Sequence, residues 1–407
     1  MSLYKKNFDV VIIGGGMVGL SIANQLLISG KSNNVCIIDK EKELGKHSSG
    51  RNSGVVHAGI YYKPGSLKAK VCIKGSKRLL NYAESRKLSI NKCGKLIIPQ
   101  KTSLDSQIDL LFNRGIKNGA QVEIIKEDKL KELSPDACSK TGRALWSPTT
   151  AVVDPLRIIK TLEKELIERG VTFIKGIKSM KFNKKLRRIN LANQEYISYG
   201  FLFNCAGLQA DKIAHQFEIG KEFKIIPFKG QYWKLRKDSK IKLRRNIYPV
   251  PDLNVPFLGI HFTPGAESDS NVSIGPTANF SFGRENYNGI QALEPIDAIK
   301  NLLIITKQYI QNKNGFKKYF HEQALLIMKP LIIKSAKELI PNLNSSDVVS
   351  SNKVGIRAQL FNIEKQKLED DFICTGDKFS THILNAISPA FTASFELADL
   401  IIENSML

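Results

Sequence analysis

The sequence lacks paired cysteines, and this absence excludes two classes of architecture. Its 6 cysteines are widely spaced and form no C-x-x-C motif, so neither a disulfide framework nor a zinc site is expected. We therefore expect a reducing compartment and no bound metal. No apolar run approaches the roughly 18 residues that a membrane span requires, and the first expected strand begins by Phe8, which leaves no room for a signal peptide. The expected location is cytoplasmic.

Acidic residues are scarce relative to basic ones. The 407 residues include 61 Lys and Arg against 38 Asp and Glu, which gives a formal net charge of +23. This charge is compatible with an anionic substrate, an anionic membrane surface or nucleic acid. The basic residues are spread along the whole chain, and the densest group, 181–188, is expected in a solvated hairpin. No contiguous basic face with interleaved aromatics is evident, so nucleic acid is not an expected partner.

A dinucleotide-binding motif is present near the start of the chain. The β-branched run 10–13 predicts a buried strand, and an apolar-periodic helix is expected directly after the glycines that follow it. In G-x-G-x-x-G spacing, the first glycine allows a tight turn, the second allows a pyrophosphate to approach the backbone, and the third allows helix and strand to pack closely. These three glycines are Gly14, Gly16 and Gly19.

Two further features complete the expected dinucleotide site. A second strand, 35–38, ends at Asp39, which is placed to accept hydrogen bonds from a ribose hydroxyl. A later strand, 201–204, ends near the small residues Ala206 and Gly207, at the edge where an open parallel sheet places its ligand. Two separated segments are therefore expected to build one adenine-dinucleotide site. The alternatives are an ordinary glycine turn and a solvated carboxylate at Asp39.

The rest of the chain predicts a second domain. Strands alternate with turns over 223–278 without helices, which is typical of an antiparallel sheet, and a helical region at 295–340 and a last helix at 390–403 follow. We expect an α/β protein with a discontinuous Rossmann-like domain and an antiparallel-sheet substrate domain. The expected division is 1–90, 148–215 and 350–407 for the cofactor domain, and 91–147 and 216–349 for the substrate domain.

Six strings resemble a known group of flavoproteins: GGGMVG, HSSGRNSGVVHAGIYYKPGSLKAK, NCAGLQAD, GIHFTP, GIRAQ and NAISPA. They resemble the L-2-hydroxyglutarate dehydrogenase/oxidase group of the D-amino-acid-oxidase-type oxidoreductases over nearly the full length, and 51–70 is the most diagnostic piece. Near the end, Ile387 stands where the group has proline, and Phe391 adds bulk. The resemblance implies a D-amino-acid-oxidase/glutathione-reductase-type fold with FAD as cofactor. It also implies oxidation of L-2-hydroxyglutarate to 2-oxoglutarate by hydride transfer to flavin N5, with electrons passed to a quinone or oxygen.

The resemblance also implies which residues hold FAD. Ala390 and Thr392, at the start of the last helix, would face the carbonyl end of the flavin ring, where a positive helix end stabilises the negative charge of the reduced flavin. The loop residues that would follow the pyrophosphate and flavin are Ser48, Ser49, Arg51, Asn52 and Ser53.

Oxidation of a 2-hydroxy acid requires a base for the hydroxyl proton and cations for the carboxylates. His57, in the flavin-facing loop, is the first candidate for the base, with a backbone hydrogen bond as its alternative role. His261, on an expected strand, is equally a site residue or a satisfied sheet histidine. Arg357 is the candidate carboxylate anchor because its planar fork binds a carboxylate in two places; its alternative is an ion pair at the domain junction. Which histidine is the base stays open.

Other candidates are weaker. His382 precedes the last helix and is equally a structural partner, Lys229 and Arg284 are expected at the surface, and Tyr61 and Tyr248 are expected as packing residues. Rival functions are an enzyme of the same fold that acts on glycerol 3-phosphate or an amino acid, and an RNA-associated flavoprotein. The charge also suggests peripheral contact with the anionic inner face of the cell membrane, where a quinone would accept the electrons.

Overall fold

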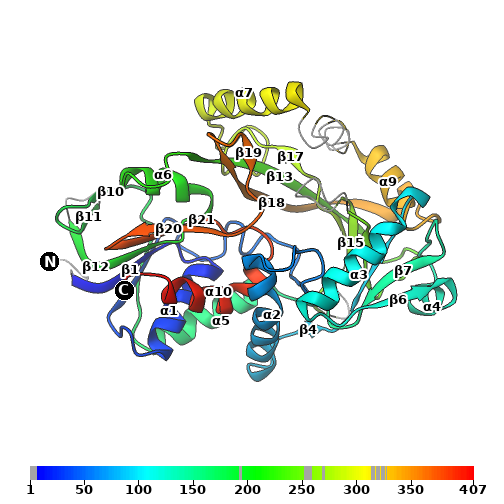
Figure 1. Cartoon of the computed structure of the whole chain (residues 1–407), viewed down its shortest axis with the longest axis horizontal. Helices are drawn as coiled ribbons and strands as arrows, with labels where there is room; N and C mark the ends of the chain where they lie inside the picture. The colour runs from blue at the N-terminus through cyan, green and yellow to red at the C-terminus, as the bar shows by residue number, and fades with distance from the viewer. Residues whose placement is uncertain are drawn as a thin grey trace. The chain divides into compact units, whose positions relative to one another are not determined.

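A computed structural model describes residues 7–191, 195–251, 259–267, 271–312, 317, 321, 326 and 328–407 (Figure 1). The chain forms two compact units, and each consists of several segments. The first unit comprises Met1–Arg51, Pro155–Ile226 and Ala358–Leu407, and the second comprises Asn52–Asp154 and Pro227–Arg357. Within the described residues, no helix is both long and apolar enough to cross a membrane.

A parallel sheet forms the centre of the first unit. Its strands read as continuous apolar runs because helices cover both faces of such sheets. Helix α1 (Met17–Ile28) packs against α5 (Pro155–Glu168) and α10 (Ala390–Glu403). The predicted strands and the last helix are confirmed. The parallel strands, in spatial order, are β21 (Ser380–Asn385), β12 (Tyr196–Asn204), β1 (Asn7–Ile13), β2 (Val35–Asp39) and β9 (Thr172–Lys175).

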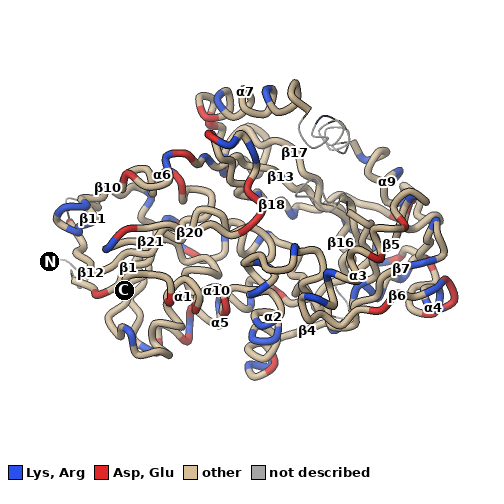
Figure 2. The backbone as a smooth tube through the Cα atoms, viewed as in Figure 1, with Lys and Arg blue, Asp and Glu red and all other residues tan. Residues whose placement is uncertain are grey.

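Shorter elements complete the first unit. The basic segment forms the predicted hairpin, in which β10 (Met180–Asn183) pairs antiparallel with β11 (Arg188–Leu191). Figure 2 shows Lys and Arg positions distributed along both units, which agrees with a compositional bias. The remaining elements are η2 (Gly207–Gln209), α6 (Ala210–Gln216), β19 (Lys367–Leu368) and β20 (Ile373–Asp377).

A larger sheet forms the centre of the second unit. The sequence predicted an antiparallel sheet, and most pairs are antiparallel, but β5 and β14 pair in parallel. These two strands are far apart in sequence, so no hairpin dictates their direction. Strands β13 (Phe223–Leu235) and β18 (Val348–Asn362) each carry the chain from one unit into the other. From β13 the order continues through β16 (Ser273–Gly275), β15 (His261–Thr263), β14 (Asn246–Pro249), β5 (Lys95–Ile98), β7 (Arg143–Ser147) and β6 (Glu123–Lys126).

The two faces of this sheet bury different side chains, because successive residues of a strand point to opposite faces. Leu96 and Phe262 belong to one apolar core of the unit, whereas Ile97 and Tyr248 belong to another. The alternation places Lys95, two residues before Ile97, on the face of Tyr248. This face carries the candidate catalytic side chains described below.

A small three-stranded sheet and several helices complete the second unit. The predicted helical region 295–340 is confirmed at two helices, while 313–316 and other parts of it lie outside the described residues. The small sheet contains β3 (Val55–Val56), β8 (Ala151–Val153) and β4 (Ile90–Asn91). The other elements are α2 (Leu67–Ser85), η1 (Thr102–Leu104), α3 (Ser106–Asn118), α4 (Glu127–Leu133), β17 (Asn279–Phe280), α7 (Pro295–Gln311), α9 (Lys329–Lys337) and η4 (Ser345–Asp347).

The unit boundaries differ from those expected at 90 and 148. Residues 52–90 pack in the second unit because β3 and β4 both pair with β8, and α2 lies against β3 and β4. Which segments bind the cofactor is a separate question, so the division into a cofactor domain and a substrate domain stays a prediction.

Candidate active site

The glycine turn after β1 has room for glycine alone. Gly14 has a φ of 103°, and a Cβ atom there would lie 2.5 Å from the carbonyl oxygen of Cys205. A Cβ atom at Gly19 would lie 2.1 Å from the carbonyl oxygen of Gly14, so α1 reaches the turn only without a side chain. At Gly16 a Cβ atom would lie 3.0 Å from Ser49 Oγ. The turn therefore leaves its backbone open, as phosphate binding requires.

Asp39 lies at the end of β2 and orders this turn. Its Oδ2 accepts a hydrogen bond from the Gly15 amide at 2.7 Å, and its Oδ1 accepts one from the Glu41 amide at 2.8 Å. Each carboxylate oxygen keeps a second lone pair, which suits a ribose hydroxyl. The position predicted for ribose recognition is thus held rigidly beside the glycine turn.

The loop after β2 returns to the start of α1. Ser49 Oγ accepts a hydrogen bond from the Met17 amide at 3.0 Å, in the first turn of a helix whose N-cap, Gly16, has no side-chain cap. Arg51 Nε donates to the Lys46 carbonyl at 2.6 Å. The hydrogen bond from the Met17 amide holds Ser49 at the positive end of α1, where a pyrophosphate is stabilised.

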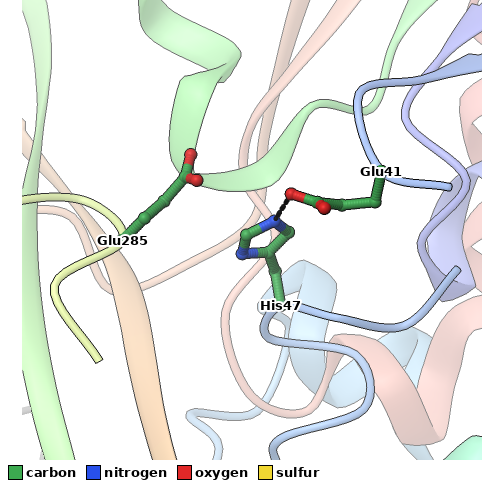
Figure 3. Close-up of side chains that lie close together, drawn as sticks. All are labelled: Glu41, His47 and Glu285. Atoms are coloured by element: carbon green, nitrogen blue, oxygen red, sulfur yellow. Dashed lines mark hydrogen bonds and ion pairs between the residues drawn. The ribbon is translucent and has the colours of Figure 1, made fainter. Parts of the chain in front are cut away.

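A histidine and a glutamate tie the same loop to the end of β2. His47 Nε2 and Glu41 Oε1 are 3.0 Å apart, and Figure 3 shows their hydrogen bond. No motif in the sequence predicted a role for His47. Its contact with Glu41 links the loop to the segment that follows Asp39.

The second predicted segment of the dinucleotide site adjoins the first one. The Cys205 amide donates to the Ile13 carbonyl at 2.8 Å, so the end of β12 lies beside the end of β1. Asn204 Oδ1 accepts a hydrogen bond from the Ala206 amide at 3.2 Å, and Gly207 has a φ of 54°. The structure thus brings Ala206 next to the glycine turn.

The last helix packs against α1 in the first unit. Ala390 and Thr392 lie in its first turn, and its N-cap, Pro389, supplies no side-chain cap. His382, a weak candidate for catalysis, is fully buried, with Nδ1 3.0 Å from Asn204 Nδ2 and Nε2 3.1 Å from Ser380 Oγ. Both ring nitrogens have partners within the fold, so His382 is a structural residue.

The predicted catalytic residues belong to the second unit. Within this unit, the charges of four basic residues lower the pKa of His57. We call His57 and these four residues the basic cluster: Lys68, Lys95, His261 and Arg357. Tyr248 stacks on His261 with ring centroids 3.9 Å apart, and His261 Nδ1 lies 2.9 Å from the Gly259 carbonyl oxygen. Tyr248 was expected as a packing residue, with a place in the pocket wall as the alternative, and its ring here stacks on a candidate base.

Burial and like charge keep the two histidines neutral. Burial, aided by the charge of Lys95, lowers the pKa of His57 to about 3, and burial lowers that of His261 to about 4. Burial lowers the pKa of Lys95 to about 8. Perturbed values of this kind gather at functional sites, because desolvation and like charges are concentrated there.

Some sequence expectations were incomplete or wrong. Arg284 was expected at the surface but is 2% exposed, and its amide donates to Glu294 Oε2. Asn52 and Ser53 belong to the second unit, and Asn52 Oδ1 accepts a hydrogen bond from the Gly54 amide. Their contact with the cofactor stays a prediction. Lys95 was missed altogether, because a lysine at the start of a strand usually lies in solvent. The three apolar residues that follow Lys95 were the only feature of the sequence that indicated its burial.

The residues of the first unit fit an adenine dinucleotide. The glycine turn, the Asp39 carboxylate, the Ser49 loop and the start of α10 suit such a cofactor. The cofactor-binding roles stay predictions for Gly14, Gly16, Gly19, Asp39, Ser48, Ser49, Arg51, Ala206, Gly207, Ala390 and Thr392. The first unit has a parallel sheet with this glycine turn and acid, and the second has a mostly antiparallel sheet with two buried, neutral histidines. Together these features define a dinucleotide-dependent oxidoreductase. The chain belongs to the DAO family of FAD dependent oxidoreductases, whose family model matches residues 9–402. Its cofactor is accordingly FAD.

Relatives confirm the group that the sequence resembles. The chain is 35% identical to an L-2-hydroxyglutarate dehydrogenase of Indibacter alkaliphilus, with 98% of each chain covered. It is 31% identical to the mitochondrial L-2-hydroxyglutarate dehydrogenase of Homo sapiens, over 97% of this chain and 88% of that one. The fold resembles L-α-glycerophosphate oxidase from Mycoplasma pneumoniae, with a TM-score of 0.75 at 21% identity, covering 98% of this chain and 94% of that one.

Proposed function

We propose that this chain oxidises L-2-hydroxyglutarate to 2-oxoglutarate with FAD. The names of the relatives support the substrate, and the basic cluster supports the chemistry. The observation that carries the proposal is the pair His57 and His261, both buried among basic side chains and both neutral. A neutral imidazole is the form that accepts a hydroxyl proton, and the surrounding cations suit a substrate with two carboxylates.

The residues have distinct roles in this proposal. When bound, FAD supplies the acceptor for the hydride that leaves C2. Arg357 holds a substrate carboxylate with two hydrogen bonds and so orients C2. His261 Nδ1 lies 2.9 Å from the Gly259 carbonyl oxygen, so that nitrogen carries the proton and Nε2 is the accepting atom. The carboxylates of the bound substrate offset the nearby cations and raise the pKa of both imidazoles towards the working pH.

The test is an anaerobic titration of the purified holoenzyme, followed through the flavin absorption at about 450 nm. L-2-hydroxyglutarate is compared with D-2-hydroxyglutarate, L-lactate, glycerol 3-phosphate and glycine. We expect bleaching by the L-diacid alone. Bleaching by glycerol 3-phosphate or glycine instead would establish one of the rival substrates of the same fold, which the relatives do not favour.

We further propose that α7 contacts an anionic membrane surface, where a quinone accepts the electrons. This helix exposes large apolar side chains: Ile296, Ile299 and Leu303 are 72%, 60% and 66% exposed. Its buried residues include the polar Asn301 and Gln308 beside Ala298 and Ile305. A helix at the surface of a soluble domain normally has the opposite pattern. An apolar face of this kind suits the boundary between lipid headgroups and acyl chains.

Charge on the same helix supports the choice of an anionic surface. Lys300 and Lys307 are both exposed, and Figure 2 shows basic positions along α7. Each lysine near an anionic leaflet contributes about 1 kcal/mol to binding. The apolar and basic groups of α7 therefore favour the same partner.

Sedimentation with vesicles tests this contact. We expect the enzyme to pellet with phosphatidylglycerol/phosphatidylcholine vesicles at low salt and to stay in the supernatant with phosphatidylcholine alone. The triple variant I296S/I299S/L303S should lose binding, while the matched variant L110S/I116S, which changes exposed apolar residues of α3, should retain it. An enzyme that stays in solution with anionic vesicles contradicts the contact. Reoxidation of the reduced flavin by a soluble quinone analogue tests the acceptor separately.

A further inference from the structure

Lys95 has an unusual position for a lysine. It is the first residue of β5, a strand in the middle of the larger sheet, between β14 and β7. Its side chain is 0% exposed and lies on the sheet face that carries Tyr248. The backbone register pairs it with Asn246 on one side and Ser147 on the other.

The ammonium group of Lys95 has no hydrogen-bond acceptor among the described residues. Instead it lies over two aromatic rings, 4.7 Å from the centroid of Tyr61 and 5.2 Å from that of Tyr248. These rings offset part of the lost hydration but accept no conventional hydrogen bond. Lysine ammonium groups donate three hydrogen bonds, so the recognition capacity of Lys95 is unused within the described fold.

No negative charge compensates Lys95 within the described residues. The acidic groups that act on it are the thiols of Cys72 and Cys93, and burial raises their pKa to about 12 and about 11, so both are neutral. The other charged or titratable neighbours in the cluster are basic. A buried cation without a partner is costly, and replacing such a residue by an apolar one usually stabilises a protein. The presence of a lysine at this position, despite the unfavourable free energy of burying its charge, points to an anionic ligand.

We propose that Lys95 determines specificity by binding the substrate carboxylate that Arg357 does not hold. This inference rests on the proposed function for the identity of the diacid. The Lys95 ammonium, confined between Tyr61 and Tyr248, then pairs with one carboxylate, while Arg357 binds the other. A 2-hydroxy acid with a methyl group in place of the distal carboxylate leaves Lys95 buried and unpaired. Such a loss of a charged partner discriminates strongly against the monoacid.

Binding without chemistry gives the first test. Glutarate and pentanoate differ only by a terminal carboxylate, and neither carries the 2-hydroxyl group. We expect glutarate, but not pentanoate, to raise the Tm of the wild-type holoenzyme and perturb its flavin spectrum. Lys95→Met should weaken glutarate binding by about 100-fold, because a charge-assisted contact is lost, while its Tm without ligand equals or exceeds that of the wild type. Lys95→Gln serves as a second variant.

A matched control separates recognition from packing. Lys353 in the same unit also lies over a tyrosine, with Nζ 5.1 Å from the Tyr232 ring centroid, and feels the negative charge of Asp154. Because Lys353 lies over Tyr232, Lys353→Met should leave the affinity for glutarate unchanged. If Lys95→Met and Lys353→Met both change only the Tm and not the affinity for glutarate, Lys95 is a packing residue and the proposal is wrong.

Turnover gives the second test. With L-2-hydroxyglutarate, Lys95→Met should raise KM by about 100-fold with a smaller change in kcat, while turnover of (S)-2-hydroxypentanoate stays as in the wild type. An equal loss of kcat on both substrates overturns the proposal, because Lys95 would then act at the reacting carbon. If glutarate binds through Lys95 but L-2-hydroxyglutarate is not oxidised, the carboxylate site stands and the proposed function fails. Equal binding of glutarate to wild type and both Lys95 variants overturns the site itself.

Discussion

The glycine turn of the first unit and the basic cluster of the second unit solve opposite problems. The turn binds through backbone groups that are close in sequence, and its polar side chain, Asp39, is already paired with two amides. The cluster consists of side chains that the fold collects from distant segments, and the ammonium group of Lys95 has no hydrogen-bond partner among the described residues. A site made of backbone is visible as a local motif, whereas a site made of buried charges depends on the whole unit.

The difference also concerns energy. The Asp39 carboxylate accepts two backbone hydrogen bonds before a ligand arrives, so it contributes to stability. The basic cluster concentrates like charges in a buried region, which lowers stability and prepares the unit for an anion. Variants of the turn should therefore damage folding and cofactor binding, and variants of the cluster should damage turnover first.

The largest expected effect follows from Gly19→Val. A Cβ atom at this position would lie 2.1 Å from the Gly14 carbonyl oxygen, so α1 must move away from the turn. We expect destabilisation by more than about 3 kcal/mol and loss of bound FAD, measured by thermal unfolding and by the flavin absorption. In the control Gly30→Ala, nothing lies within 4 Å of the added Cβ atom, although Gly30 itself has a φ of 68°. Retention of FAD by Gly19→Val contradicts this account of the turn.

Histidine variants compare the two units directly. His57→Gln and His261→Gln should each lower kcat by about 10²- to 10⁴-fold with little change in Tm, because a proton acceptor is lost. His382→Gln should retain kcat and lower stability by about 1 to 3 kcal/mol, because the contacts with Asn204 and Ser380 are lost. Rate measurements and thermal unfolding on the same samples check the contrast. A large loss of kcat in His382→Gln alone would reverse the assignment.

Asp39→Ala should have an intermediate effect. It removes the acceptor of the Gly15 amide, 2.7 Å away, together with the expected ribose contact. We expect the Kd for FAD to rise by about 10- to 100-fold, measured by titrating the apoprotein. Glu41→Ala is the matched control, because it removes the partner of His47 and leaves the turn intact. Equal affinities in the two variants would argue that Asp39 has no role in binding.

Stability should also depend on pH through the buried histidines of both units. The folded-state pKa is about 3 for His57 and about 4 for His261 and His382, against 6.5 when unperturbed. The unfolded chain therefore binds more protons below pH 6.5, and stability decreases as the pH falls towards about 4. Each histidine contributes up to about 3 kcal/mol over this interval. Thermal unfolding at several pH values should show a shallower slope for His261→Gln, and an unchanged slope contradicts the buried neutral state.

Much of the fold followed from local patterns. The helix at 390–403 was predicted with the bounds that the structure shows, and the predicted strands at 10–13 and 35–38 lie within β1 and β2. The parallel pairing of β5 with β14 was not predictable, because no turn connects these strands and direction is then decided by packing. The buried position of Arg284 was likewise decided by neighbours distant in sequence, among them Glu294.

The sequence by itself determined the dinucleotide turn and its acid, because glycine conformation and the end of a strand are local properties. It also indicated His57 and His261 as the candidate bases. Only the tertiary structure decided that Lys95 is buried and that Tyr248 stacks on His261. The pKa of a side chain depends on desolvation and on charges within a few ångströms, and these come from segments far apart in the chain. The sequence therefore indicates which residues are candidates for the site, and the packing of the folded chain determines their charge states.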